Sequence, residues 1–461
     1  MTNEKDPLLS QLAAHIGGDK HRLLDAEGDE ARGQPPTEAE LAKPYAAPGT
    51  NALLKRGIVY QADWQPYGDG VARHAREVAL ALAAAGVPIS LQPISTQSLL
   101  DSDTHPSVMR QVGHLRNITL DNALGAIRHT VLHDFESVHN LLIPKAARLV
   151  DPAIAEAMLA RTIVYTSWER DRVDGRIADL LRRCAAVWVP CTTNAVVFRD
   201  MGIDKVDIIP FPYLPGDPMS RMAIPYVQGG AVPEGKRFYA IGKWEPRKNY
   251  AALVKAFLLA FRPTDKAALF IKTSNYGDWD GYPRSEAAVA AAFEDDRISR
   301  AWTPDQVRQR VRIVSRRVSE KDLRGIHAKN NIYVSASHGE AWDIPAFEAC
   351  CAGNRLVHVG WGGSHDYAPP GSVQVQCAGL EAVPEQYGWE PDAQWARVPE
   401  EQLVSALQAA TPLEERVHPS DFNGRFSRYA VGQLAKHRMI ERLNLDVDTR
   451  RELMGTVPSY G

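Results

Sequence analysis

The sequence predicts an α/β protein made of two successive series of alternating strands and helices. The first series opens with a strand at Gly57–Tyr60, which a loop joins to a helix at Val71–Gly86 before the chain returns as a strand at 87–94. A second series starts with the run Arg237–Gly242. Prolines and glycines crowd residues 212–233 between the two series, as is typical of an interdomain linker. We therefore predict two Rossmann-like domains.

Each domain contains further apolar runs of strand length. In the first domain these predicted strands lie at 131–133, 162–166, 186–190 and 206–211. In the second domain a helix at 250–261 precedes predicted strands at 268–273, 311–315, 331–336 and 355–360. An amphipathic helix is predicted at 426–443. The expected organisation is a flexible extension (1–50), a first domain (51–225), a second domain (232–425) and a final helix with a tail (426–461).

Composition excludes several classes of protein. The chain has 461 residues, of which 44 % are hydrophobic and 24 % charged, as in an ordinary soluble globular protein. A net charge of −3 does not indicate a strongly basic nucleic-acid surface. Five cysteines without a Cys-x-x-Cys pair argue against a disulfide framework or a zinc site, and favour a reducing cytoplasm. No signal peptide and no apolar run of about 20 residues is expected, which leaves peripheral contact with the inner membrane face open.

The most informative motif lies near the C-terminal third, where two glutamates stand eight positions apart. A buried strand is predicted just before them, so Glu340 falls on the loop at its carboxyl end. Pro345 suits the first position of a helix and Gly353 the position after its end, which places Glu348 on the first turn. Such crevices bind ligands in open α/β sheets. Free N–H groups would attract phosphate there, and the carboxylates could hold sugar hydroxyls, so a sugar nucleotide is indicated.

With these residues in place, the chain resembles a known family. Glu340-x7-Glu348 followed by Ala349-x-x-Ala352-Gly353 is similar to the donor site of retaining glycosyltransferases of family 4. These enzymes have the GT-B fold, in which two Rossmann-like domains face each other across a cleft and a C-terminal helix crosses back to the first domain. The stretch Phe426–Gly432 is similar to the start of that helix. The resemblance covers about residues 51 to 445, with its specific motifs mainly in the second domain.

The resemblance implies a donor site that needs neither a metal nor a cofactor. Lys243 and Lys248 match two basic residues that clamp the donor diphosphate, although the first is more often arginine in the family. Fixed cations would stabilise the charge that grows on the departing nucleoside diphosphate. Glu348 matches the residue that binds the ribose diol, and Glu340 the one beside the donor sugar and phosphate.

One departure from the family lies inside the motif. A Gly-Phe-Gly-like run usually follows the first glutamate, and this chain has Ala341-Trp342-Asp343 instead. Asp343 could bind a donor hydroxyl or interact with the start of the helix. Ile344 and Arg247 complete the donor-binding residues expected in this domain.

The first domain is expected to supply the acceptor side of the site. His133 follows a predicted strand at a place where family members often have a histidine that faces the donor sugar. Glu169 could bind an acceptor hydroxyl or simply begin a helix, and His338 is a second candidate histidine. Gly68 and Gly70 would let a loop approach the diphosphate or the acceptor closely.

Two further patterns allow more than one interpretation. Asp278-Trp279-Asp280 could hold a divalent metal on donor phosphates, but a polar turn is the preferred interpretation. Arginines cluster at 308–317, and strand alternation would place Arg310 and Arg312 on one face. This cluster could meet nucleotide phosphate, anionic lipid or nucleic acid, or remain solvated and ion-paired.

We therefore expect a retaining, metal-independent hexosyltransferase that uses a nucleoside-diphosphate sugar, with a carbohydrate or lipid-linked glycan as acceptor. A hydroxylated base in phage DNA is a less usual acceptor, which the arginine cluster keeps open. Two further classes of protein fit the same motifs, namely a GT-B sugar-nucleotide epimerase and a non-catalytic sugar-nucleotide-binding protein. The sequence names neither the base nor the sugar.

Overall fold

A computed structural model describes most of the chain after its first 56 residues. The described residues are 57–63, 70–94, 123–132, 134–143, 152–212, 234–274, 281–315, 318, 320–384, 392–416, 419 and 422–455. They fall into two compact units. The C-terminal unit takes the described residues within Ile224–Glu381 and Ala396–Pro419; the N-terminal unit takes those within Pro36–Ala223, Ala382–Trp395 and Ser420–Gly461.

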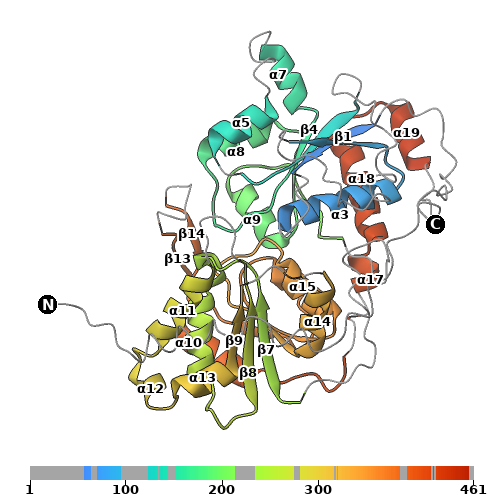
Figure 1. Cartoon of the computed structure of the whole chain (residues 1–461). Coiled ribbons are helices and arrows are strands. Elements are labelled where there is room, and N and C mark those ends of the chain that lie inside the picture. Colours follow the sequence, from blue (N-terminus) through green and yellow to red (C-terminus); the bar gives the residue numbers. More distant parts are fainter. Residues whose placement is uncertain are drawn as a thin grey trace. The chain divides into compact units, whose positions relative to one another are not determined.

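The N-terminal unit is built on a six-stranded sheet whose order is β2-β1-β3-β4-β5-β6. Strands β1 and β4 of this sheet are labelled in Figure 1. Every pair of neighbouring strands is parallel. The strands are β1 (Ile58–Ala62), β2 (Ile89–Pro93), β3 (Gly125–His129), β4 (Thr162–Tyr165), β5 (Ala186–Val189) and β6 (Val206–Ile208). The helices between them are α3 (Gly70–Ala84), α5 (Phe135–Leu142), α7 (Pro152–Leu159), α8 (Gly175–Arg183) and α9 (Thr192–Asp200).

The C-terminal unit contains a second parallel sheet of six strands, in the order β12-β11-β10-β7-β8-β9. Its strands are β7 (Lys236–Ile241), β8 (Ala267–Lys272), β9 (Val311–Val314), β10 (Ile332–Ser335), β11 (Arg355–Val359) and β12 (Val373–Val375). Its helices are η2 (Pro246–Lys248), α10 (Tyr250–Ala260), α11 (Gly281–Ala292), α12 (Asp296–Ser299), α13 (Pro304–Arg310), α14 (Glu320–Lys329), α15 (Ile344–Cys351), η3 (Gly363–Asp366) and α16 (Glu400–Ala409).

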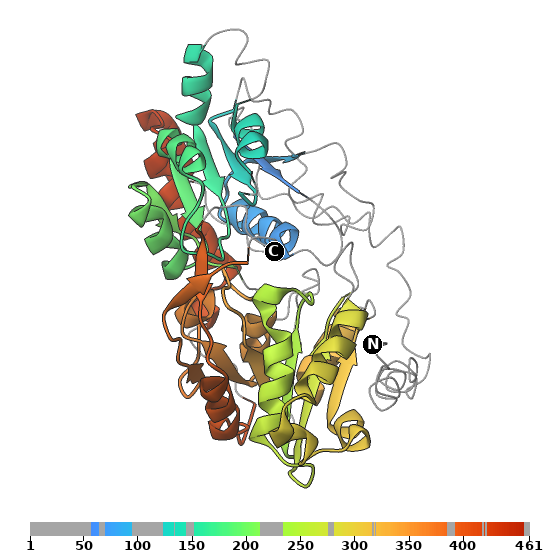
Figure 2. The ribbon, with the colours of Figure 1, turned by 90° about the vertical axis from the view of Figure 1, so that its left-hand side faces the viewer.

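The strand order of the C-terminal sheet is that of the Rossmann fold. Numbered from β7, it reads 3-2-1-4-5-6 from β9 to β12. Figure 2 shows helices on both faces of this sheet, which explains why its inner strands are mainly apolar runs rather than alternating ones. The order reverses between β7 and β10, and the carboxyl ends of these two strands form the switch point where such sheets bind ligands. The predicted α/β class with two Rossmann-like parallel sheets is confirmed.

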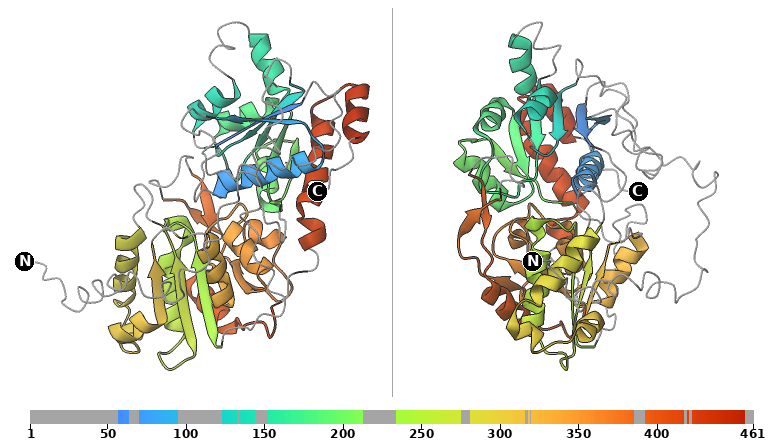
Figure 3. Two further views of the ribbon diagram at one scale, coloured as in Figure 1. Left: turned by 45° about the vertical axis from the view of Figure 1, so that its right-hand side comes forward. Right: turned by 60° about the vertical axis from the view of Figure 1, so that its left-hand side comes forward.

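The last helices belong to the N-terminal unit, as expected for a helix that returns to the first domain. They are α17 (Phe422–Arg425), α18 (Arg428–Arg442) and α19 (Val447–Gly455). Figure 3 shows α18 beside α3, and the contact is close: a Cβ built on Gly432 would lie 2.1 Å from the carbonyl oxygen of Ala81. The buried Arg428 guanidinium pairs with Glu77 of α3 at 2.7 Å. Val431, Ala435 and Met439 complete the core around β1 and α3.

Two details of the secondary-structure prediction are wrong. The strand predicted at 131–133 ends earlier, because β3 is Gly125–His129. Its last two residues, Arg128 and His129, are polar yet buried, so the strand does not stand out as an apolar run. Leu132, by contrast, is buried in the helix-side core that includes α5 and α8.

The arginine cluster is the second correction. Arg310 ends α13 and Arg312 lies on β9, so strand alternation does not place them on one face. Pro304 and a capping box between Thr303 and Gln306 start the helix there. Arg316 and Arg317 lie outside the described residues, as does most of the predicted linker.

A last element, a short ribbon of β13 (Leu380–Ala382) and β14 (Gln394–Ala396), lies outside both six-stranded sheets. Among the helices that the structure describes, none combines the length and apolar character needed to cross a membrane.

Candidate functional site

Two loops meet at the switch point of the C-terminal sheet. One leaves β7, forms the short turn η2 and enters α10; the other leaves β10 and enters α15. Backbone and side-chain hydrogen bonds tie them together. The N–H of His338 donates to the carbonyl of Arg247 at 2.8 Å, and the Ser337 hydroxyl donates to the same carbonyl at 2.9 Å. The position of η2 is therefore set by the loop that carries Glu340.

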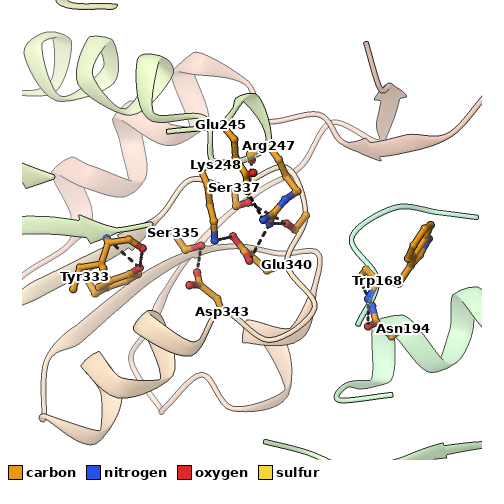
Figure 4. A network of polar contacts seen from close by, with 12 residues as sticks. Trp168, Asn194, Glu245, Arg247, Lys248, Tyr333, Ser335, Ser337, Glu340 and Asp343 are labelled. Carbon is orange, nitrogen blue, oxygen red and sulfur yellow. Dashed lines mark hydrogen bonds and ion pairs between the residues drawn. The ribbon is translucent and has the colours of Figure 1, made fainter. Parts of the chain in front are cut away.

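Glu340 is the centre of a buried ion-pair cluster (Figure 4). Its Oε1 lies 2.5 Å from Nζ of Lys248, and its Oε2 lies 3.0 Å from Nη1 of Arg247. Arg247 also pairs with Glu245 at 2.6 Å. The Glu340 side chain is only 7 % exposed, so its charge depends on these cations. Arg247 and Lys248 are thus held at a fixed place at the sheet edge.

The pKa values of this cluster follow from a competition between burial and charge. Burial opposes ionisation of Glu340, but Arg247 and Lys248 outweigh it and hold the pKa of Glu340 below its usual value. Burial likewise opposes the charge of Lys248, and the carboxylates of Glu340 and Asp343 raise the pKa of Lys248 in spite of it. Both groups are therefore charged at neutral pH.

Asp343 has one satisfied and one unsatisfied carboxyl oxygen. Its Oδ2 accepts a hydrogen bond from the Ser335 hydroxyl at 2.5 Å (Figure 4). Its Oδ1 is buried without a hydrogen-bond partner among the described residues. The residue stands at the N-cap of α15 with φ 62°, yet its side chain makes no cap hydrogen bond. Burial, and secondarily the Glu340 carboxylate, raise the pKa of Asp343 to about 6. Such a group can donate or accept a hydrogen bond near neutral pH.

Helix α15 begins at Ile344, one residue earlier than predicted, with Pro345 in its first turn. Glu348 is therefore the fifth residue of the helix, one residue further along than expected, and its side chain is buried. Its Oε2 lies 3.7 Å from Nε2 of His327 on α14. Gly353 follows the helix with φ 71°, as the sequence predicted.

The turn η3 fixes the backbone between Glu340 and Asp343 from the other side. The N–H of Gly363 donates to the carbonyl of Glu340 at 2.8 Å. A Cβ at Gly363 would lie 2.1 Å from the carbonyl oxygen of Ala341, so only glycine allows this approach. The Tyr367 hydroxyl donates to the carbonyl of Asp343 at 3.1 Å.

The remaining predicted residues lie on loops next to this cluster, in the N-terminal unit, or outside the described residues. Lys243 is half-buried on the loop after β7. Gly70 is the first residue of α3 in the N-terminal unit. His338 contacts the carbonyl of Ala396 at 2.7 Å and Glu381 at 3.3 Å, next to the β13–β14 ribbon. Gly68, His133 and Asp278–Asp280 lie outside the part of the chain that the structure describes.

Glu169 lies half-buried on the loop after β4. This loop is fixed by the side-chain amide of Asn194 on α9, which accepts from the N–H of Trp168 at 3.0 Å and donates to its carbonyl at 2.6 Å (Figure 4). The Trp168 indole N–H donates to the carbonyl of Arg172 at 2.8 Å. The backbone that carries Glu169 is therefore well anchored.

Sequence reasoning missed the polar residues that support the site. Ser335 and Ser337 alternate where β10 ends, a weak signal that could have pointed to them. A set of buried polar residues is linked to Glu348 through His327. Most of them are far from Glu348 in sequence and carry no local signal; they are Tyr239, His327, Asn354 and Arg416. Among the described residues, no group of three or more histidine, cysteine, aspartate or glutamate side chains is arranged to hold a metal ion.

Comparison with known proteins gives only remote likenesses. No protein-family profile and no curated protein matches the chain. Among solved structures, HepE of Anabaena in complex with UDP and glucose is 12 % identical, with a TM-score of 0.42, over 86 % of this chain and 97 % of that one. Sucrose-phosphate synthase of Thermosynechococcus elongatus is 12 % identical (TM-score 0.45; 87 % and 98 % covered). A glycosyltransferase of Rickettsia africae is 11 % identical (TM-score 0.47; 87 % and 100 % covered). Likeness this weak assigns no family to the chain.

Proposed function

We propose that the chain is a glycosyltransferase that takes its sugar from a nucleoside-diphosphate donor bound at the switch point of the C-terminal sheet. The observation that carries this proposal is the cluster of Arg247, Lys248 and Glu340 beside the start of α15. Two fixed cations and the positive end of a helix suit a diphosphate. The unpartnered Oδ1 of Asp343 suits a hydroxyl of the donor sugar.

The proposal gives each donor-side residue one role. Lys243, Arg247 and Lys248 face the diphosphate and stabilise the charge that it gains on leaving. Glu340 holds the two paired cations in place. Glu348 accepts from the ribose diol. Ile344, at the start of α15, offers a backbone N–H that the helix itself leaves unpaired.

The proposed reaction retains the configuration of the sugar and needs no metal, as the family resemblance implies. The bond from the anomeric carbon to the phosphate oxygen breaks, and the acceptor oxygen bonds to the same face of that carbon. The proton of the acceptor hydroxyl passes to the departing phosphate oxygen. We assign the acceptor, a carbohydrate or lipid-linked glycan, to the N-terminal unit, with Glu169, His133, Gly68 and Gly70. The described arginines of the cluster do not favour a nucleic-acid acceptor. Arg308 pairs with Asp305, and Arg310 donates to the carbonyl of Pro263.

The test is binding and turnover with matched glutamate variants. Thermal shift with UDP, GDP and ADP should identify one stabilising ligand, since a ligand at 100 times its Kd adds about 2.7 kcal/mol. Glu348→Gln should weaken the binding free energy of that ligand by about 1.5–3 kcal/mol in calorimetry, because the site loses a charged hydrogen-bond acceptor. Glu401→Gln, on the exposed face of α16, is the control and should bind as wild type does. If no nucleotide binds, the proposal fails; conversion of the donor sugar to its epimer without an acceptor would favour an epimerase.

A further inference from the structure

A buried chain of polar side chains leads from Arg416, which lies at the end of α14, to Glu348 on α15. Arg416 Nη1 lies 2.7 Å from Oδ1 of Asn354, and Asn354 Nδ2 lies 2.6 Å from the hydroxyl of Tyr239. That hydroxyl lies 2.8 Å from Nδ1 of His327, whose Nε2 is 3.7 Å from Oε2 of Glu348. All five side chains are buried, so water does not replace these partners. We refer to them as the Arg416–Glu348 relay.

The guanidinium of Arg416 fixes the orientation of the Asn354 amide. A guanidinium only donates, so the Asn354 atom that faces Arg416 is the amide oxygen. The amide nitrogen then donates to the Tyr239 hydroxyl and, at 2.9 Å, to the carbonyl of His327. In the arrangement that lets this hydroxyl both accept and donate, its own proton goes to Nδ1 of His327. A neutral imidazole that accepts at Nδ1 carries its proton on Nε2.

Arg416 also anchors the helix that carries His327. Its Nη2 donates to the carbonyls of Ala328 at 2.6 Å and Asn330 at 2.8 Å, at the end of α14. These are carbonyls that a helix end leaves without partners. The ring of His327 is therefore held both by its helix and by the tyrosine of β7.

We propose that His327 is a positioning residue for Glu348, and that the relay aims its Nε2–H at the carboxylate that binds the ribose diol. The inference rests on the proposed function for the role of Glu348. Nε2 is buried and has no hydrogen-bond partner within the described structure, while the carboxylate lies just beyond hydrogen-bond length. A carboxylate that is oriented by electrostatic attraction to a fixed N–H loses less freedom when it binds a diol, so the relay raises nucleotide affinity without touching the nucleotide.

Two substitutions separate this role from simple packing. In His327→Gln the amide nitrogen reaches the place of Nε2, whereas in His327→Asn the shorter amide reaches only the place of Nδ1. With the tightest binder among UDP, GDP and ADP as probe, we expect His327→Gln to stay within about threefold of wild type and His327→Asn to bind about tenfold more weakly. In a Glu348→Gln background the difference between the two should disappear, since a double-mutant cycle isolates their coupling.

Several results would overturn the inference. Equal losses in both variants, or an unchanged difference in the Glu348→Gln background, would make His327 a packing residue only. Nitrogen-15 NMR of histidine-labelled protein should show His327 protonated on Nε2, and a proton on Nδ1 would refute the relay. Should His327→Asn fail to fold, Tyr239→Phe removes only the hydroxyl that donates to Nδ1, and the same spectrum should then lose its Nε2–H preference.

The two proposals can fail separately. If no nucleoside diphosphate binds the wild-type protein, the proposed function is lost. The NMR spectrum would still test the tautomer of His327. A double-mutant cycle at residues 327 and 348, measured by urea unfolding, would still decide whether the two side chains are coupled.

Discussion

At the scale of single residues, the unusual group is the carboxyl of Asp343. One oxygen is bound by Ser335, and the other is buried without a partner among the described residues. The backbone of Asp343 adopts a left-handed conformation that non-glycine residues rarely take, which concentrates strain at the entrance of α15. Both features are typical of a residue kept for a ligand rather than for stability.

Asp343→Asn should stabilise the protein more at pH 8 than at pH 5. The pKa of Asp343 is raised to about 6 in the folded chain, whereas an unfolded aspartate titrates near about 3.9. Between these values the folded state keeps a proton that the unfolded state loses. The contribution of this group to stability is therefore complete below pH ~4 and falls as the pH rises through ~6, by at most about 1.4 kcal/mol per pH unit. Urea unfolding at both pH values measures this, and an equal effect at pH 5 and pH 8 would contradict it.

Lys248→Met should lower both stability and nucleotide affinity. It leaves the buried Glu340 with one fewer cation, and breaking such a pair costs about 3 kcal/mol. The double variant Lys248→Met/Glu340→Gln should regain most of the stability but not the nucleoside-diphosphate binding. Urea unfolding and calorimetry on the same samples separate the two effects. A double variant that binds as wild type does would remove Lys248 from the diphosphate site.

At the scale of elements, α18 depends on close contact with α3 at Gly432. We expect Gly432→Ala to destabilise the N-terminal unit by about 1–3 kcal/mol, because the added methyl meets the backbone of Ala81. Gly424→Ala on α17 is the control, since a Cβ there meets no atom within 4 Å. Hydrogen exchange of α3 reports the effect directly. Equal protection of the α3 amides in both variants would show that the methyl at position 432 does not weaken the contact between α18 and α3.

The elements also show what the sequence could and could not predict. Strands β7, β8 and β10 are mainly apolar runs, and β10 is buried along its whole length, so their composition alone located them. β3 was misplaced because it ends in buried Arg128 and His129. The spacing of Glu340 and Glu348 located the site, since one strand–loop–helix unit carries both. The residues that are linked to Glu348 through His327 come from β7, α14 and the segment after α16, and no local pattern links such distant residues.

At the scale of the whole molecule, each unit has its own parallel sheet and its own core. The polar cluster proposed for the donor is contained in the C-terminal unit, so nucleotide binding is expected to be a property of that unit. Turnover in addition requires the residues that we assign to the N-terminal unit.

Turnover should therefore survive chelation by EDTA. In the proposed function, Arg247, Lys248 and the start of α15 stabilise the diphosphate, so that no divalent metal is required for this role. The measurement is the initial rate with and without EDTA at saturating donor. Complete loss of activity, restored by manganese or magnesium, would instead make Asp278-Trp279-Asp280 a metal site.

The packing of α18 against α3 has a consequence for how the protein is made. A ribosome releases the chain from its N-terminus, and domains usually fold in that order. Here the apolar face of α3 packs against Val431, Ala435 and Met439. These three residues are synthesised after every described strand of the C-terminal unit. The domain that is synthesised first thus completes its core last. Until then its nascent form exposes apolar surface that chaperones can bind. A late nonsense mutation that removes only the final helices would therefore destabilise the first domain and leave the core of the second domain intact.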